Sequence, residues 1–533
     1  MARYKLQTLG VMIDMSRNSV MNVESLKRYL TILKKMGYNT VMLYTEDTYE
    51  VENEPYFGYL RGRYTMEEMR EIDDFAASLG IEMIPCVQTL AHLSTFLRWN
   101  QVHSDTPDIM LADSPRTYEF IDHLLATLSE CFRSKKIHIG MDEANLLGRG
   151  RFLDIHGYEK TADIMMRHLN KVLAITKKYD YEPLVWSDMF FRAWNGGNYY
   201  ADKVKMPQEI LDNFPREVIP VYWDYYSTEE SRYDGMICNH KQFSDKTWFA
   251  CAAWSSASAV PFNQKSLPRI LPALDACKKH KIRNIICTLW GDGGGECSHF
   301  SQLPALLYTA EYAKGNTDEA SIKAKFRRIV GIDYDDFIKI DLPNEVIETT
   351  GIINPSKYML FSDCFGGFLD PNVEVGKGRF YADSAASLRD VAAQNRKFAY
   401  LFDSAAKLCD VLEYKYELGV KTRAAYEAGD KQALRELAEN DYITVEKRLA
   451  AYHSAYQKQW FRDNKPQGFE VQDIRLGGLM QRLRSCRKRL LDYADGKTPN
   501  IPELEEKILD YCGPSAKLLR LYKYTDIATV NVY

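Results

Sequence analysis

The sequence predicts an α/β protein in which a (β/α)8 barrel of the TIM type is followed by an α-helical C-terminal domain. Over about the first 315 residues, eight short apolar runs alternate with segments long enough to form helices. Strands that alternate with helices pair in parallel, and eight such units close into a barrel. Polar residues follow nearly every run, at the strand ends where barrel enzymes carry their active sites. A doubly wound open sheet is the alternative architecture.

The predicted strands are short runs of apolar and β-branched residues. One polar residue after a strand is often a helix cap, whereas polar residues after nearly every strand are better explained as the lining of one pocket. The runs span residues 9–15, 40–44, 82–87, 136–143, 182–186, 218–223, 248–254 and 284–290. The polar residues at their ends are Asp14, Glu46, His92, Asp142, Glu143, Asp188, Asp224 and Asp292.

The segments between the strands show the signals of helices with one buried face. In 23–36 apolar residues recur every three or four positions, and Gly37 follows as a typical C-cap. Thr65 and Glu68 form a capping box that opens the second helix, which Gly80 ends. We expect helices over about 23–36, 65–80, 114–132, 158–178 and 267–280, and one that begins near Leu303.

The stretch from Lys136 to Glu143 places two neighbouring carboxylates, Asp142 and Glu143, at the end of a buried strand. Because strand side chains alternate between faces, both can serve one site only if the chain turns, and residues 144–150 supply a loop. Two adjacent acids repel each other, so we expect one to hold a proton near neutral pH, as a general acid must. The alternative interpretation is that the two acids only cap a helix at an ordinary strand end.

Composition divides the whole chain into three parts. We assign residues 1–342 to the barrel, 343–383 to an irregular linker or loop region rich in Gly and Pro, and 384–533 to the helical domain. Amphipathic stripes in the last part are typical of a helical bundle. Such domains often pair, so a homodimer is one arrangement that we expect.

Composition excludes several classes of partner. The net charge of −4, without a long basic run, gives no reason to expect nucleic acid. No apolar run reaches the roughly 18 residues of a membrane span, and the first residues do not form a signal peptide. The 11 cysteines lack CxxC spacing, which favours reduced thiols in a cytoplasmic protein over a disulfide frame or zinc site. A phosphate-binding loop is also lacking. We expect no cofactor, and no metal at the site.

A pocket with two adjacent acids, a histidine and several tryptophans suits glycoside hydrolysis. Aromatic faces stack on sugar rings, and carboxylates bind hydroxyls and transfer protons. Most glycosidases place two carboxylates on opposite sides of the scissile bond, which adjacent acids cannot do. The nucleophile must then come from elsewhere, and the oxygen of a 2-acetamido group on the substrate is the obvious candidate.

Residues 138–143, His-Ile-Gly-Met-Asp-Glu, resemble the His/Asn-x-Gly-x-Asp-Glu motif of glycoside hydrolase family 20, the β-N-acetylhexosaminidases. The resemblance covers about residues 9–315, and the helical C-terminal region is similar to the compact bacterial branch of that family. Each of the other matching segments is weak evidence alone, and together they support the resemblance. They are residues 10–17, 43–47 and 85–92 and the pairs Tyr222-x-Asp224 and Trp290-x-Asp292.

The resemblance implies a retaining exo-β-N-acetylhexosaminidase that removes terminal β-linked GlcNAc or GalNAc from an oligosaccharide or glycoconjugate through an oxazolinium intermediate. It implies that Glu143 is the general acid and then the base, and that Asp142 orients the acetamido group. Tyr222 would donate a hydrogen bond to the acetamido oxygen, and Glu46 and His92 would form a relay behind Glu143. The residues implied in substrate binding are Trp186, Trp254, Trp290, Asp224 and Asp292.

Two positions depart from the family pattern. Leu9 stands where the family usually has an arginine that grips outer sugar hydroxyls, so another group must do this work or selectivity is relaxed. The family's Pro-Gly-His turn is replaced by residues 89–92, Thr-Leu-Ala-His. Two other functions stay open: a barrel that binds amino sugars without cleaving them, and a hexosaminidase of another substrate-assisted family. The preference between GlcNAc and GalNAc is open as well.

Overall fold

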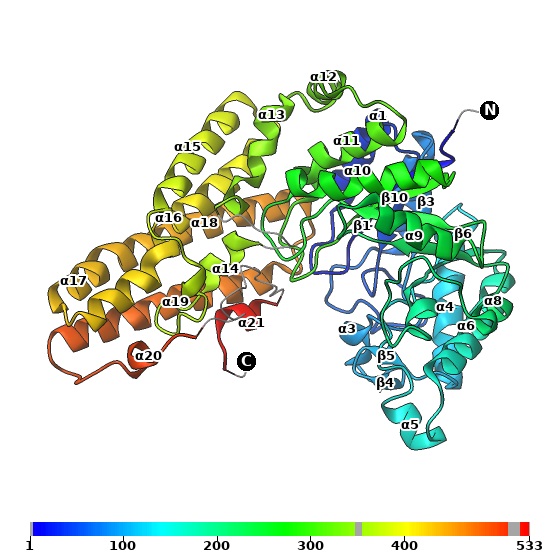
Figure 1. Ribbon diagram of the computed structural model, residues 1–533, viewed down its shortest axis with the longest axis horizontal. Helices are drawn as coiled ribbons and strands as arrows, with labels where there is room; N and C mark the ends of the chain where they lie inside the picture. The colour runs from blue at the N-terminus through cyan, green and yellow to red at the C-terminus, as the bar shows by residue number, and fades with distance from the viewer. Residues whose placement is uncertain (1–3, 347–353, 510–522, 532–533) are drawn as a thin grey trace. The chain divides into compact units, whose positions relative to one another are not determined.

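A computed structural model describes residues 4–346, 354–509 and 523–531 of the 533-residue chain (Figure 1). The chain forms two compact units, each built from several segments. The first consists of Met1–Ala253, Lys265–Trp290 and Ala305–Ile322, and the second of Trp254–Gln264, Gly291–Pro304 and Lys323–Tyr533. The domain boundaries expected at residues 342 and 383 stay a prediction.

The first unit contains the predicted barrel. Eight parallel strands close in the order β1-β10-β9-β8-β7-β6-β3-β2, so strands that follow each other in the chain are neighbours in the barrel. The strand bounds agree closely with the predicted runs, except at β6. They are β1 (Thr8–Asp14), β2 (Thr40–Tyr44), β3 (Glu82–Cys86), β6 (Lys136–His138), β7 (Glu182–Trp186), β8 (Ile219–Trp223), β9 (Trp248–Ala252) and β10 (Asn284–Leu289).

Strand β6 is shorter than predicted because the chain leaves the extended conformation at Gly140, where φ is +71°. The pairing with β7 nevertheless continues past His138, since the amide of Ile139 donates to the carbonyl of Leu184 at 2.8 Å. A second difference is a small antiparallel pair between β4 (Ser104–Thr106) and β5 (Ile109–Met110), which the sequence did not predict.

Apolar periodicity and capping residues in the sequence predicted the positions of the helices well. Helix α1 (Val23–Met36) has the predicted bounds and ends at Gly37 with φ of +96°. The capping box at Thr65 is present, with the Thr65 hydroxyl and the Glu68 carboxylate each accepting from the other's amide. The further helices between or after the strands include α2 (Met66–Ser78), α4 (Pro115–Cys131), α6 (Thr161–Lys178), α7 (Asp188–Arg192), α9 (Glu230–His240), α10 (Asn263–Lys279) and α11 (Leu303–Ala313).

The second unit is helical, as predicted. Its long helices run side by side, with α16 between α15 and α18, and α19 against α18 (Figure 1). Residues 343–383, expected to be irregular, include α14 (Pro355–Phe361) and the short helix η3 (Asp370–Asn372). The long helices are α15 (Gly378–Gln394), α16 (Ala399–Glu427), α18 (Tyr442–Asp463) and α19 (Phe469–Ala494).

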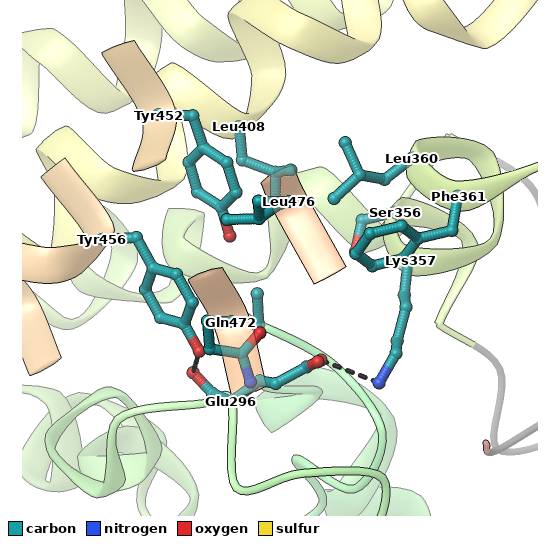
Figure 2. A pocket seen from close by; sticks show the side chains of 11 residues that line it. Glu296, Ser356, Lys357, Leu360, Phe361, Leu408, Tyr452, Tyr456, Gln472 and Leu476 are labelled. Atoms are coloured by element: carbon teal, nitrogen blue, oxygen red, sulfur yellow. Dashed lines mark hydrogen bonds and ion pairs between the residues drawn. The ribbon is translucent and has the colours of Figure 1, made fainter. Parts of the chain in front are cut away.

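A buried ion cluster ties α14 and α19 to residue Glu296 inside the second unit, and Figure 2 shows its pair between Glu296 and Lys357. The Glu296 carboxylate lies 2.9 Å from Nζ of Lys357 and 2.7 Å from Nη1 of Arg475. Burial raises the pKa of Glu296, but these two cations outweigh burial and hold the pKa below its ordinary value. The adjacent cavity has a volume of only about 10 Å³, room for about one water molecule, so this cluster is a brace and not a substrate site.

The ten cysteines that the structure describes form no disulfide, as the sequence predicts. Among the described residues, no helix combines the length and the apolar character that crossing a bilayer requires.

Candidate active site

A tight turn after β6 brings Asp142 and Glu143 to one site. Gly140, Met141 and Glu143 all have positive φ, of +71°, +71° and +52°. A Cβ atom on Gly140 would meet the Gln88 side chain and lie 2.7 Å from the carbonyl oxygen of Val87, so only glycine fits. Left-handed backbone at a non-glycine residue costs about 1 kcal/mol or more, and such strain clusters at functional sites.

The histidine of the motif stabilises this turn. His138 is fully buried, and its Nδ1 accepts a hydrogen bond from the amide of Gly140 at 3.1 Å. Burial lowers the pKa of His138 to about 3, so the ring is neutral and can act as this acceptor.

Asp142 is buried between an amide and an imidazole. Its Oδ1 accepts from Nε2 of Gln88 at 2.7 Å, and its Oδ2 lies 3.2 Å from Nε2 of His92. The other end of the Gln88 amide accepts from the backbone of Met141 at 3.1 Å, which ties the same side chain to the turn. Gln88 therefore holds both the Asp142 carboxylate and the backbone of the turn that precedes it.

Glu143 has different surroundings, because 44% of its side chain is exposed, against 13% for Asp142. Its Oε2 lies 3.7 Å from Nε2 of His92, and its Oε1 lies 3.7 Å from Nη2 of Arg192. Nε2 of His92 thus lies near a carboxylate oxygen of each of the two acids. Glu143 is the acid that can meet a ligand from solvent.

The charges of this pair follow from their contacts. Burial lowers the pKa of His92, but the charges of Asp142 and Glu46 outweigh burial and raise it to about 10. Burial raises the pKa of Asp142, but His92 and Gln88 outweigh burial and lower it. Asp142 is therefore ionised, and His92 is its cation. The proton expected on one of the two acids is not on Asp142.

The pKa of a third carboxyl, Asp188 at the start of α7, is raised into the neutral range. Burial and the charge of Asp142 raise the pKa of Asp188 to about 7. Its Oδ2 accepts from the amide of Glu143 and from Nε of Arg192, each at 3.0 Å. The sequence marked Asp188 as a strand-end acid without a role and did not indicate Arg192, which no motif distinguishes.

Glu46 reaches the site through two intermediates. The hydroxyl of Tyr44 donates to Glu46 at 3.1 Å and accepts from Nε2 of Gln88 at 2.9 Å, and Gln88 in turn donates to Asp142. Arg17 pairs with Glu46 at 3.2 Å. Burial raises the pKa of Glu46, although Arg17 and His92 oppose this. These hydrogen bonds lead from Glu46 to Asp142, whereas the expected relay led to Glu143.

Two of the three predicted tryptophans lie together in the first unit. The rings of Trp186 and Trp290 are 6.1 Å apart, and Tyr44 meets Trp290 edge to face at 4.8 Å. The Arg17 guanidinium lies 5.6 Å from the Trp290 ring. Leu9, where the family has its arginine, is 3% exposed in the core, so its side chain has no part in the site.

Tyr222 and Asp224 end β8 and form a pair. The buried Tyr222 hydroxyl donates to Oδ2 of Asp224 at 2.9 Å, so donation to a substrate requires this hydrogen bond to break. Beside Asp224 lies an open hollow of about 530 Å³ with aromatic and charged walls. Its lining consists of Tyr200, Asp202, Asp224, Tyr226, Ser227, Glu229, Ser231 and Arg232.

The other two predicted binding residues belong to the second unit. Trp254 is 4% exposed, and its carbonyl accepts from the amide of Phe262 at 2.8 Å. The carbonyl of Asp292 accepts from the amide of Ala257. The part of Trp254 and Asp292 in substrate binding stays a prediction.

Comparison with known proteins gives two domain matches. The family model of the glycosyl hydrolase family 20 catalytic domain matches residues 9–210. The model of the Glycoside Hydrolase 20C C-terminal domain matches residues 335–520.

Similar proteins carry hexosaminidase names. Hexosaminidase D of Bos taurus is 24% identical over 311 residues, which are 53% of this chain and 83% of the relative. Hexosaminidase D of Homo sapiens is 24% identical over 348 residues, which are 58% of this chain and 66% of the relative. The β-N-acetylhexosaminidase structure from Bacteroides fragilis is 17% identical, with a TM-score of 0.47, and the match covers 61% of this chain and 70% of that one. The chain thus spans just under two thirds of the human relative.

Proposed function

The chain belongs to glycoside hydrolase family 20, and we propose that it is a retaining exo-β-N-acetylhexosaminidase. Its substrates are oligosaccharides or glycoconjugates that end in β-linked GlcNAc or GalNAc. The catalytic-domain match and the name Hexosaminidase D of its relatives support this substrate class. Membership in family 20 removes the alternative of another substrate-assisted family. A homodimer and a cytoplasmic location stay predictions.

The observation that carries the proposal is the unequal state of two neighbouring acids. Asp142 is buried and ionised beside His92, while Glu143, the next residue, is open to solvent. A fixed carboxylate can stabilise positive charge, and an accessible carboxyl can exchange protons with a substrate and water. These are the two tasks that substrate-assisted hydrolysis divides between acids.

In the first step, the acetamido oxygen of the substrate attacks the anomeric carbon as the glycosidic bond breaks. Glu143 gives its proton to the departing oxygen. Positive charge develops on the acetamido N–H, and the Asp142 carboxylate accepts a hydrogen bond from that group. Because Gln88 and His92 already hold Asp142 in place, little reorganisation is needed when the charge forms.

In the second step, water attacks the same carbon from the side that the leaving group vacated. Glu143, now ionised, takes a proton from this water, and the oxazolinium ring opens. Two displacements at one carbon retain the β configuration. His92 and Arg192, each 3.7 Å from a Glu143 oxygen, are suited to stabilise its ionised form.

Further groups have roles in the proposed mechanism. Tyr222 turns its hydroxyl from Asp224 to the acetamido oxygen, and Asp224 is then released to bind a sugar hydroxyl. Trp186 and Trp290 offer apolar surface to the sugar. Trp254 and Asp292 are retained in this proposal from the family resemblance. Glu46 acts on Asp142 through Tyr44 and Gln88.

The test is hydrolysis of an aryl β-N-acetylglucosaminide by wild type and by Glu143→Gln. The variant keeps the size of the side chain and loses the transferable proton, so turnover should fall at least about 100-fold, as general acid–base catalysis contributes about that much. Glu182→Gln, an exposed change at the start of β7, is the control and should leave turnover unchanged. Full activity of Glu143→Gln would contradict the assignment. A wild type that binds the sugar without cleaving it would favour the amino-sugar-binding barrel.

A further inference from the structure

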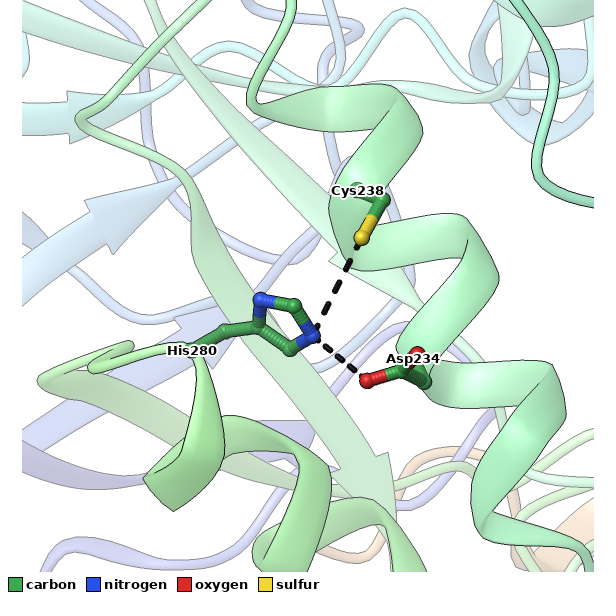
Figure 3. Close-up of side chains that lie close together, drawn as sticks. All are labelled: Asp234, Cys238 and His280. Atoms are coloured by element: carbon green, nitrogen blue, oxygen red, sulfur yellow. Dashed lines mark hydrogen bonds and ion pairs between the residues drawn. The ribbon is translucent and has the colours of Figure 1, made fainter.

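A second group of side chains with metal-ligating atoms lies away from the acids after β6. Asp234 and Cys238 are four residues apart on α9, so they share one face of the helix, and His280 is the first residue after α10 (Figure 3). One ligating atom of each residue lies within 4.8 Å of the others. All three residues are partly exposed, so an ion could reach them from solvent.

The distances are close to those of a tetrahedral zinc site. Nε2 of His280 lies 2.6 Å from Oδ1 of Asp234 and 3.9 Å from Sγ of Cys238. Ordinary bond lengths to Zn²⁺ place a nitrogen and an oxygen ligand about 3.4 Å apart, and a nitrogen and a sulfur ligand about 3.6 Å apart. The changes needed in these two distances are below about 1 Å, which small side-chain rotations supply.

We propose that Asp234, Cys238 and His280 bind one divalent ion of the Zn²⁺ type, with water as the fourth ligand. A thiolate, an imidazole and a carboxylate form the mixed set that zinc and cobalt accept, whereas Mg²⁺ and Ca²⁺ require oxygen ligands. On binding, the Cys238 thiol releases its proton to solvent, and the ring proton of His280 resides on Nδ1. Among the described cysteines, Cys238 is partly exposed and the others are buried.

The charges around the site both favour and oppose a cation. Cys238 lies in the last turn of α9 and His280 follows the last turn of α10, and the carbonyl ends of helices favour positive charge. Against this, Nζ of Lys279 lies 2.8 Å from Oδ1 of Asp234 and competes for the same oxygen. Removing the ammonium group of Lys279 should therefore strengthen metal binding.

The position of the site indicates a bracing role. Helices α9 and α10 lead into the amino ends of β9 and β10, whereas Asp142 and Glu143 follow the carboxyl end of β6. An ion would join these two helices on the face opposite to the acids. Sequence spacing could not indicate this site, because 42 residues separate Cys238 from His280.

The experiment uses Co²⁺ as the probe on the full chain after treatment with a chelator. One equivalent of Co²⁺ should produce a near-ultraviolet thiolate-to-cobalt absorption band, and Zn²⁺ should displace it. Cys238→Ser and His280→Gln should lose the band and still hydrolyse substrate, while His156→Gln, at the end of another helix, should keep it. Lys279→Gln should bind Co²⁺ severalfold more tightly than wild type.

Zn²⁺ should also raise the Tm of wild type but not of Cys238→Ser, and this readout confirms that each variant is folded. The proposal is overturned if the folded wild type gives no thiolate band, or if the band survives in Cys238→Ser. Binding at His92, Asp142 and Glu143, which also lie close enough to share an ion, would produce no thiolate band and would count against it.

Discussion

The backbone amide of Glu143 donates a hydrogen bond to Oδ2 of Asp188, with 3.0 Å between the two atoms. The same oxygen accepts from Nε of Arg192, whose Nη2 lies 3.7 Å from the Glu143 carboxylate. One buried carboxyl therefore fixes both the backbone of the proposed general acid and a cation beside its side chain. Substitutions of Asp188 should alter the stability of the protein and the dependence of that stability on pH, although Asp188 has no proposed contact with the substrate.

Asp188→Asn should make stability less dependent on pH. The pKa of Asp188 is raised to about 7 in the folded state, against about 3.9 for an unperturbed aspartate. The folded state thus binds this proton more tightly, so ionisation costs stability as pH rises from about 4 to about 7. The variant lacks that cost, and its free energy of unfolding relative to wild type should rise by up to about 1.4 kcal/mol per pH unit over this range.

Urea denaturation at several pH values between about 4 and 8 measures this difference. Asp180→Asn, a change at a largely exposed aspartate, is the control and should give a flat difference. A flat difference for Asp188→Asn as well would mean that Asp188 ionises normally.

His92→Gln should show a dependence of the same sign at higher pH. The pKa of His92 is raised to about 10, so the stability that its charge supplies is fully present below the unfolded value of about 6.5. It is lost as pH rises through about 10. The stability gap between wild type and the variant should therefore narrow between about pH 7 and pH 10, as measured by urea denaturation. A gap that stays constant would show that His92 is not charged in the folded protein.

Gly140→Ala should destabilise the protein and lower activity. The added methyl group would meet the Gln88 side chain and the Val87 carbonyl, on top of the strain of a φ of +71°. We expect a loss of at least about 2 kcal/mol, because both strain and a steric clash contribute. Gly429→Ala separates the two causes, since Gly429 has a similar φ of +66° but nothing within 4 Å. Equal losses in the two variants, by thermal or urea unfolding, would show that the close contact with Gln88 is unimportant.

Tyr222→Phe should slow the chemical step. The hydroxyl is proposed to donate to the acetamido oxygen as that oxygen attacks, and removal of one such donor costs about 100- to 1,000-fold in kcat. Since Tyr222 bonds to Asp224 before the reaction, its loss should leave KM nearly unchanged. Steady-state kinetics with an aryl substrate separate the two parameters. A rise in KM at constant kcat would instead assign Tyr222 to binding alone.

The order and bounds of the barrel strands could be read from the sequence because each strand is a buried apolar run. The exception, β6, depends on a turn whose left-handed residues Met141 and Glu143 carry no sequence signal of that conformation. Gly140 suggested that another group lies close to the backbone at this position, and the Gln88 side chain is that group. Such a contact joins distant parts of the chain, so no local pattern predicts it.

The candidate site was predicted only where its residues belong to motifs. The adjacent acids and His92 were indicated, and they lie together. Gln88 and Tyr44 lie in family-like segments but were given no role, and Arg192 was not indicated at all, because their roles arise from what they contact in three dimensions. The charge states also depend on three-dimensional contacts: burial and the charge of Asp142 raise the pKa of Asp188 to about 7, whereas His92 and Gln88 lower the pKa of Asp142.

The central claim is that the substrate's own acetamido oxygen is the nucleophile and that ionised Asp142 steers it. The most direct measurement is kcat/KM for a series of aryl β-glucosaminides whose N-acetyl methyl group carries increasing numbers of fluorine atoms. Fluorine withdraws electrons from that oxygen without much change in size. The account predicts a steep fall in kcat/KM along the series for wild type, and a much shallower one for Asp142→Asn. Rates that are the same for all members would contradict it and indicate a nucleophile on the enzyme.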